Sequence, residues 1–348
     1  MKGAPQKKRK GGGKSGGGGK GEKGRDASGS HRQVTLEAAE ETEVGPHVSH
    51  GFGGWEAVTS KAVSHAQTRW LMDDKLDDSA TVLKVVDWNV LAQAYTFAHF
   101  YKHLSNCAST LAWNKRSKMI FETLRQLEAD IVCLQEVDAW GEVQSVLAGM
   151  GYDGVFQGRT GHKTDGLAIL WKRDKLAAIG GKEVLLYGAT LGKEGEDRVA
   201  VRVCLSLLRA PERRVTVATT HLDYKRPRVQ VQMCHMFAEF VREASRAARD
   251  LMVACGDFNS ERVSEAVQTF AAESKLSSAL PLCDPLGHPV FTACIKDPKN
   301  IDHMFFDQRF ARVVGIVAPF MSSAKLPHES YPSDHLLVGA AFELSPRE

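Results

Sequence analysis

Residues 251–259 read Leu-Met-Val-Ala-Cys-Gly-Asp-Phe-Asn, an apolar run that ends in two closely spaced polar side chains. The run Leu251–Ala254 predicts a short buried strand, and Asp257 and Asn259 follow soon after it. Loops and strand ends that a rigid sheet holds in place are where binding and catalytic groups concentrate. This stretch therefore predicts both a central strand and a functional edge beside it.

The same arrangement recurs beside the other apolar runs of the chain. Polar side chains flank five further predicted strands: Asn89 after Val82–Val86, Glu136 after Ile131–Leu134, His221 after Val215–Thr220, Asp302 within Ile301–Phe306, and Asp334 and His335 before Leu336–Phe342. Any one of them alone is accounted for by a turn, a cap or a strand-end charge. Their appearance together, each beside an apolar run, favours a single site.

The remaining periodicity favours an α+β fold. Further strands and helices are predicted over Leu167–Trp171 and Val199–Leu208 (strands) and over Lys115–Glu128, Val229–Ala247 and Arg262–Ser274 (helices). Because strands outnumber helices and single helices interrupt them, we expect a layered sandwich of about 270 residues in one catalytic domain, residues 81–348. Residues 31–80 are weakly patterned, with one short helix expected near Ala62–Met72.

The charge of the chain is unevenly distributed. The net charge is +3, but residues 1–26 alone carry +7, which leaves a mildly acidic remainder. Residues 1–30 hold eleven of the 31 glycines and almost no bulky apolar side chain, so we expect a disordered basic tail. Its run Lys7-Lys8-Arg9-Lys10 resembles a nuclear-import signal or a nonspecific RNA-binding arm, with a solubility tail as the alternative.

Composition and cysteine use exclude several classes of protein. Of the 348 residues 43% are hydrophobic, and no stretch approaches the ~18 uninterrupted apolar residues of a membrane span. Seven scattered cysteines without a Cys-x-x-Cys pair argue against a disulfide framework or a structural zinc site. We therefore expect a protein of the cytoplasm, the nucleus or both, without a membrane partner. The composition of the basic tail makes a mitochondrial location less favoured than the cytoplasm or the nucleus.

Seven segments of the sequence, taken in order, resemble the successive motifs of the endonuclease/exonuclease/phosphatase superfamily. They are Trp88-Asn89-Val90-Leu91-Ala92, Leu134-Gln135-Glu136-Val137, Asp165-Gly166-Leu167-Ala168-Ile169, Thr220-His221-Leu222, Gly256-Asp257-Phe258-Asn259, Ile301-Asp302-His303 and Tyr331-Pro332-Ser333-Asp334-His335. They are most similar to the nocturnin and carbon-catabolite-repressor deadenylase branch, which reads Asn-x-Leu-Ala at the first strand and Tyr-Pro-Ser-Asp-His at the last. The resemblance covers about residues 82–345.

The resemblance implies a four-layered α/β sandwich, two central mixed sheets flanked by helices, with a phosphohydrolase site that depends on Mg²⁺ or Mn²⁺. Mg²⁺ takes oxygen ligands and keeps several waters, so one or two carboxylates suffice to hold it. Glu136 is the expected first ligand, and Asn89 would supply an amide to the metal or to a phosphate. Asp334 could serve a second metal.

The resemblance also assigns catalytic roles. Asp257 would orient and deprotonate the attacking water, and Asn259 would hold the phosphate or that water. Asp302 would orient His335, which would stabilise charge that develops on the phosphoryl oxygens. His221 matches the second phosphate-contacting histidine of the family.

The chain departs from the family pattern after His221. Nocturnin-like sequences carry a lysine two positions after this histidine, where this chain has Asp223. A carboxylate there would repel a phosphate, which disfavours NADP as the substrate. Lys225, Arg226 and Arg228 follow closely and form the nearest phosphate clamp, with ordinary helix-start surface charges as the alternative.

The sequence thus favours a 3′→5′ exoribonuclease of deadenylase type that acts on single-stranded RNA or poly(A). One alternative is a phosphatase for a small nucleotide, such as NADP(H) or 2′,5′-oligoadenylate. The other is a catalytically inactive RNA-binding module, against which the complete set of acids and imidazoles argues. Of the aromatic residues near the motifs, Tyr224 could stack on a base, whereas Trp88 and Phe258 flank strands and are expected in the core.

Overall fold

The computed structural model describes residues 68–76, 81–195, 197–247, 250–283, 290–294, 296–318 and 325–346. The basic tail expected over residues 1–30 and most of the weakly patterned residues 31–80 lie outside these ranges. The structural statements below concern the described residues.

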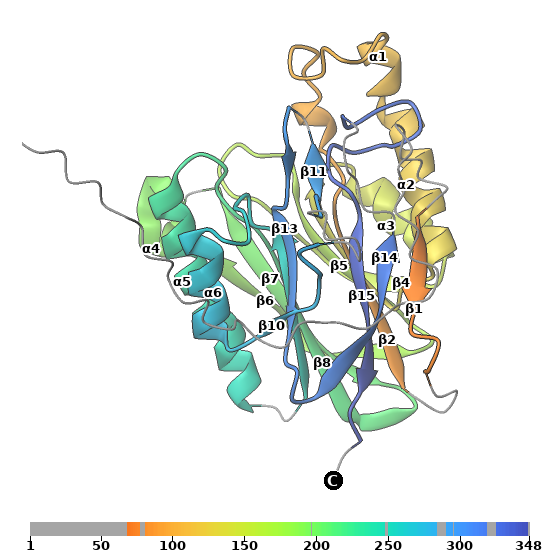
Figure 1. Cartoon of the computed structure of the whole chain (residues 1–348), viewed down its shortest axis with the longest axis vertical. Helices are drawn as coiled ribbons and strands as arrows, with labels where there is room; N and C mark the ends of the chain where they lie inside the picture. The colour runs from red at the N-terminus through yellow and green to blue at the C-terminus, as the bar shows by residue number, and fades with distance from the viewer. Residues whose placement is uncertain are drawn as a thin grey trace, which may run out of the picture. The chain divides into compact units, whose positions relative to one another are not determined.

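Two mixed β-sheets form the centre of the fold (Figure 1). The first sheet consists, in spatial order, of β1 (Arg69–Met72), β14 (Ala311–Ala318), β15 (Val338–Leu344), β2 (Val82–Asn89), β3 (Ile131–Val137), β5 (Gly166–Lys172) and β4 (Tyr152–Gly158). The second consists of β10 (Ser277–Ser278), β13 (Asp302–Phe306), β9 (Leu251–Asp257), β8 (Ala210–His221), β7 (Val199–Leu207) and β6 (Leu176–Leu186). Each sheet contains one parallel pair, β2–β3 and β8–β9.

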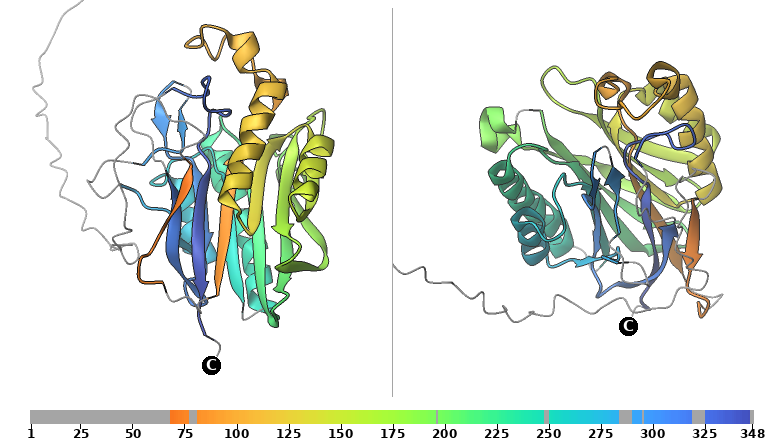
Figure 2. Two further views of the ribbon diagram at one scale, coloured as in Figure 1. Left: turned by 90° about the vertical axis from the view of Figure 1, so that its right-hand side faces the viewer. Right: turned by 45° about the horizontal axis from the view of Figure 1, so that its top comes forward.

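Helices cover the outer face of each sheet. The helices are α1 (Cys107–Thr110), α2 (Trp113–Leu127), α3 (Trp140–Gly149), α4 (Gly188–Leu191), α5 (Pro227–Ala247) and α6 (Glu265–Ser274). Figure 2 shows α5 and α6 on one side of the sheets and α2 and α3 on the other, which confirms the predicted four-layered sandwich. A membrane crossing would need a longer or more apolar helix than any in the described residues.

The apolar core is layered in the same way. One cluster fills the space between the two sheets, and two others lie between each sheet and its helices. In α2, Ile120, Leu124 and Leu127 recur at helical spacing and are buried against the first sheet. The helix ends at Glu128, whose backbone is left-handed (φ 45°). A short two-stranded ribbon, β11 (Ala293–Cys294) with β12 (Pro298–Lys299), lies outside the sheets.

Apart from the helix near Ala62–Met72, the predicted strands and helices are present. The sequence reasoning missed β1, β4, β6, β14 and α3, and the short elements α1, α4, β10, β11 and β12. The helix expected near Ala62–Met72 is wrong over Arg69–Met72, and its earlier residues lie outside the described ranges. These four residues form β1, which pairs antiparallel with β14. Pairing with a strand more than 240 positions later overrides the local pattern, and β1 lies ahead of the predicted domain start at residue 81.

Candidate active site

Strand register brings the predicted site residues to one end of the sheets. In the second sheet His221 on β8 and Asp302 on β13 both lie opposite Asp257 on the central strand β9. In the first sheet Asn89, the last residue of β2, lies opposite the residue before Glu136 on β3. Both parallel pairs therefore deliver polar side chains at their carboxyl ends, where open α/β sheets bind ligands.

Left-handed backbone is concentrated around this end. Of five non-glycine residues with positive φ in the described ranges, Glu128 and Lys275 end helices. The other three are Leu91 (59°), Glu136 (58°) and Asn259 (51°), all beside the site. Such strain is found preferentially at functional sites. At Glu136 it coincides with an irregularity in the β3–β5 pairing, which re-aims the side chain.

Gly256 allows β9 to approach β8 closely just before Asp257. Its φ is 143°, and a Cβ there would lie 2.1 Å from the carbonyl oxygen of Thr220. Any side chain would therefore push the two parallel strands apart. The glycine of the Gly-Asp-Phe-Asn segment is required by this packing, and it fixes where Asp257 stands.

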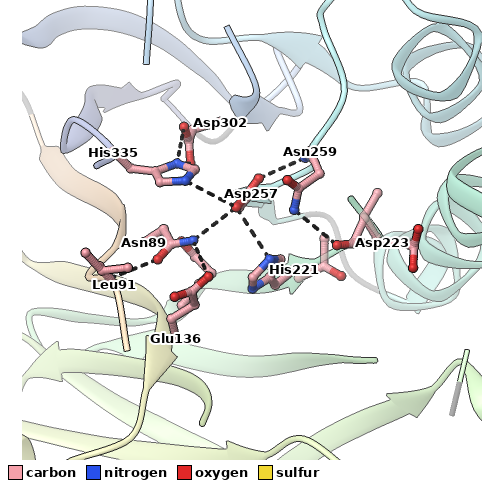
Figure 3. A network of polar contacts seen from close by, with 12 residues as sticks. Asn89, Leu91, Glu136, His221, Asp223, Asp257, Asn259, Asp302 and His335 are labelled. Carbon is pink, nitrogen blue, oxygen red and sulfur yellow. Dashed lines mark hydrogen bonds and ion pairs between the residues drawn. The ribbon is translucent and has the colours of Figure 1, made fainter. Parts of the chain in front are cut away.

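Asp257 is the centre of the polar network (Figure 3). Its Oδ2 accepts a hydrogen bond from Nδ2 of Asn89 (3.0 Å), and its Oδ1 accepts one from the backbone N of Asn259 (2.8 Å). Nε2 of His221 lies 3.5 Å from Oδ2, and Nε2 of His335 lies 3.7 Å from the same atom. Burial raises the pKa of Asp257 to about 6, close to the range that suits a general base.

The histidine His335 is oriented by Asp302. Nδ1 of His335 donates to the Asp302 carboxylate, 2.9 Å from Oδ2 and 3.0 Å from Oδ1, which turns Nε2 toward Asp257. The backbone N of Asp302 in turn donates to Oγ1 of Thr292 (3.0 Å). Asp302 therefore lies where the resemblance expects it.

The two histidines of the site have opposite charge preferences. Burial, followed by the cations Arg198 and Arg159, lowers the pKa of His221 well below its usual range. Burial also disfavours the charged form of His335, but the carboxylates of Asp302 and Asp257 outweigh it and raise the pKa of His335 well above its usual range. A neutral and a cationic imidazole thus face the same carboxylate, the pattern that separates acid and base roles.

The predicted metal-binding residues face one another across the end of the first sheet. Oε1 of Glu136 accepts from Nδ2 of Asn89 (3.2 Å), and Oε2 accepts from the backbone N of Ala92 (3.0 Å). Burial and the nearby Asp334 raise the pKa of Glu136 to about 7. Neighbouring carboxylates such as half-buried Glu136 and buried Asp334 gain from a divalent cation, and oxygen donors suit Mg²⁺, so the residues present fit the ion. Asn89 presents its amide nitrogen here, which favours its predicted substrate-binding role over metal ligation.

The predicted substrate-binding cations lie beside the core of the site, at the start of α5. Lys225 is exposed and sits over the ring of Tyr224, itself 60% exposed, and Arg228 is also exposed. Arg226 is paired with Asp223, whose Oδ2 lies 2.7 Å from Nη2. Because Asp223 also accepts from the backbone N of Lys225 and of Arg226, it holds the turn that leads into α5, and its charge is already offset.

Three buried groups around the site were missed by sequence reasoning. Arg198 is 5% exposed, and its Nη1 donates to the carbonyl oxygen of His221 (3.4 Å). Tyr101 donates from Oη to Oδ2 of Asp334 (3.0 Å). Arg116 is fully buried in α2, and its Nη1 donates to the carbonyls of Val90 and Pro332, on the segments that follow Asn89 and precede Asp334. Of these three groups only Arg116 could have been found from the sequence, because it is an arginine within the apolar face of a predicted helix.

A family model described as the endonuclease/exonuclease/phosphatase family matches residues 88–335. The chain belongs to this family. The match begins at Trp88, beside Asn89, and ends at His335, so it spans the whole candidate site. Trp88 and Phe258 are completely buried, which confirms their predicted place in the core of this family fold.

Curated relatives confirm the predicted branch of the endonuclease/exonuclease/phosphatase family. The chain is 26% identical to nocturnin of Mus musculus over 318 residues, which cover 82% of the chain and 72% of that protein. It is 30% identical to Protein angel homolog 2 of Homo sapiens over 227 residues, which cover 61% of the chain but 41% of that protein. These relatives support a hydrolase.

Solved structures agree on the fold. The human nocturnin catalytic domain with bound sulfate superposes with a TM-score of 0.66 at 23% identity, covering 82% of this chain and 100% of that one. ANGEL2, described as a 2′,3′-cyclic phosphatase and bound to adenosine-2′,3′-vanadate, gives 0.69 at 23% identity, covering 80% and 98%. At this identity the likeness is one of fold.

Proposed function

We propose that this chain is a Mg²⁺-dependent phosphohydrolase that acts as a 3′→5′ exoribonuclease of deadenylase type on single-stranded RNA or poly(A). The observation that carries the proposal is the convergence on Asp257. A buried carboxylate with a pKa near 6 lies within reach of one neutral and one cationic histidine, next to the Glu136 carboxylate. This combination suits hydrolysis of a phosphate ester.

Asp257 acts as the general base in this proposal. Its Oδ1 is held by the backbone N of Asn259, and its Oδ2, which accepts from Nδ2 of Asn89, has a further lone pair to take the proton of the attacking water. The new bond joins the water oxygen to phosphorus, and the ester bond to the leaving 3′ oxygen breaks as that oxygen takes up a proton from solvent water, to which Asp257 later returns the proton that it accepted. Cationic His335 and the Nε2 donor of His221 stabilise the charge on the phosphoryl oxygens.

Glu136, with Asp334 beside it, would hold the metal ion. A bound Mg²⁺ would withdraw charge from the phosphoryl oxygens and the leaving oxygen. Asn89 donates to both Glu136 and Asp257, and so keeps the metal-binding and the base carboxylate in register.

The preference for an RNA end over NADP rests on the start of α5. Two positions after His221 the chain has Asp223 in place of a cation, and this carboxylate accepts from the backbone N of Arg226. Lys225 and Arg228 are exposed and can contact a phosphate backbone. Tyr224 offers an exposed ring beside them. Because Asp223 is bonded to Lys225 and Arg226, replacing it with lysine would also disrupt the turn that leads into α5. A comparison of substrates therefore tests the preference for RNA over NADP better than the Asp223→Lys variant does.

The decisive experiment compares substrates with purified full-length protein. Labelled oligo(A), oligo(U), NADP and adenosine 2′,3′-cyclic phosphate are incubated with Mg²⁺, with Asp257→Asn as the inactive control. We expect shortening of oligo(A) from its 3′ end with the highest kcat/KM and no turnover by the control. Faster hydrolysis of NADP would replace the exoribonuclease by a small-nucleotide phosphatase, and faster opening of the cyclic phosphate would favour the activity described for ANGEL2.

A further inference from the structure

Three aromatic side chains stand exposed on the segment that joins β2 to α1. Phe97 is 50% exposed, Phe100 is 48% exposed, and His99 between them is exposed as well. The ring centroids of His99 and Phe100 lie 4.1 Å apart, and those of Phe97 and His99 lie 5.8 Å apart with the rings stacked. Exposed aromatic rings grouped in this way mark a binding surface, because rings of this size are usually buried.

This segment is tied to the candidate active site on both sides of the rings. Ahead of them, the backbone N of Ala92 donates to Oε2 of Glu136 (3.0 Å). Behind them, Oη of Tyr101 donates to Oδ2 of Asp334 (3.0 Å). Phe100 precedes Tyr101 directly, and consecutive Cα atoms are about 3.8 Å apart. The exposed rings therefore begin one residue from a side chain that touches a predicted metal ligand.

The surroundings of the rings suit a polyanion. Residues 93–106 contain no aspartate or glutamate, and Lys102 and His103 come after Tyr101, which follows the rings. Figure 1 shows the segment between β2 and α2 projecting at the end of the molecule where β11 lies. It is held there by buried Arg116, whose Nη2 donates to Oε1 of Gln93 (3.2 Å). Exposed aromatic rings beside a lysine match the pattern of single-strand binding proteins, and the nearby carboxylates of Asp138 and Asp165 are engaged by Ala94 and Tyr95 of the segment.

We propose that Phe97, His99 and Phe100 form a stacking platform for a nucleobase of single-stranded RNA whose 3′ end occupies the active site. The proposal rests on the proposed function and names where the upstream strand leaves the site. An exonuclease holds the 3′-terminal phosphate ester at Asp257, so the preceding nucleotides must exit past one rim. Stacking accepts every base, so the platform adds affinity without base choice.

The test is the double variant Phe97→Ser/Phe100→Ser in the full-length protein. We expect KM for a ten-nucleotide oligo(A) to rise on the order of tenfold, with a smaller rise for a dinucleotide. The salt dependence of binding should keep its slope, because no phosphate contact is lost. Leu208→Ser, at a 46% exposed residue in the turn after β7, is the matched control, and Phe97→Tyr/Phe100→Tyr should restore the wild-type KM.

A second measurement separates this proposal from the proposed function. In an Asp257→Asn background, oligo(A) carrying 2-aminopurine at successive positions from the 3′ end reports stacking by loss of fluorescence, whether or not RNA is cleaved. We expect quenching at one internal position that disappears in the Phe97→Ser/Phe100→Ser variant. Equal quenching and equal affinity in both proteins would overturn the platform. Absence of RNA hydrolysis by wild-type protein would instead remove the proposed function, with the fluorescence still deciding the platform.

Discussion

Nδ1 of His335 lies 2.9 Å from Oδ2 of Asp302, and both residues are buried. A carboxylate accepts hydrogen bonds, so this contact places a proton on Nδ1 and fixes the ring with Nε2 toward Asp257. The two residues are 33 positions apart, on β13 and on the loop before β15. Their contact makes the orientation of His335 a property of the fold.

Asp302→Asn should therefore lower kcat by about 10²–10³ with little change in KM. The amide would offer Nδ2 to the ring and favour the wrong tautomer, while the side-chain volume stays the same. Steady-state kinetics on oligo(A) measures the effect. Asp307→Asn is the matched control, because Asp307 is buried at the other end of β13 and pairs with Arg309. Loss of kcat in both variants alike would contradict the orienting role.

Glu136→Gln should lower kcat by at least about 10²-fold and raise the Mg²⁺ concentration needed for half-maximal activity. The amide keeps the shape of the side chain but removes the charge that holds the cation. The measurement is a Mg²⁺ titration of activity, and chelation with EDTA should abolish turnover until Mg²⁺ or Mn²⁺ is added back. Glu212→Gln, at an exposed position of β8, serves as the control. Near wild-type turnover of Glu136→Gln at low Mg²⁺ would refute the metal assignment.

Arg116→Met should destabilise the fold by about 3 kcal/mol, because buried carbonyls lose their donors. Arg116 donates to the carbonyls of Leu111, Val90 and Pro332 from a completely buried position. Urea unfolding followed by circular dichroism gives the free energy of unfolding. Arg125→Met, on the same helix, removes an exposed pair with Glu122 and should lower the free energy of unfolding far less. Equal losses of unfolding free energy in the two variants would contradict a contribution from the buried hydrogen bonds of Arg116.

The protein should lose stability as the pH is lowered from about 6.5 to about 4, because of His303. Burial, with Arg262, lowers the pKa of His303 to about 4, although its bond to the Ser260 carbonyl and the charge of Asp302 act in the opposite direction. Below pH 6.5 the unfolded chain takes up a proton that the folded chain does not, so folding loses on the order of 2–3 kcal/mol across this window. His303→Gln should flatten the wild-type slope in a series of urea titrations. An unchanged slope would assign the pH dependence to other groups.

Removal of residues 1–30 should leave kcat on short oligonucleotides unchanged and weaken binding to long RNA. We expect a basic tail to contribute phosphate contacts alone, so the slope of log affinity against log salt should become shallower. Fluorescence anisotropy at several salt concentrations measures this. A slope equal to that of the full-length protein would leave targeting as the function of the run Lys7-Lys8-Arg9-Lys10.

Most of the site could be predicted from the sequence because its residues follow strongly apolar strands. Asp257 and Glu136 stand directly after buried runs, and a strand of known direction fixes the edge at which such residues emerge. Apolar periodicity predicted a layered α+β sandwich, and the family resemblance supplied the two sheets with their covering helices. The edge strand β1 could not be predicted in this way, because its pairing with β14 depends on residues far away in the chain.

By itself the sequence determined the layered fold, the family and the set of candidate site residues, since apolar periodicity and ordered motifs are local properties. The tertiary structure alone decided the charge states of His221 and His335, because burial and neighbours from other strands set these pKa values. It also decided that Asp223 holds the turn before α5 and that Tyr101, next to the exposed ring of Phe100, contacts Asp334. The two pKa values depend on distances between residues that are remote in the chain. The contacts of Asp223 and Tyr101 depend on how the backbone turns, which the pattern of apolar and polar residues does not show.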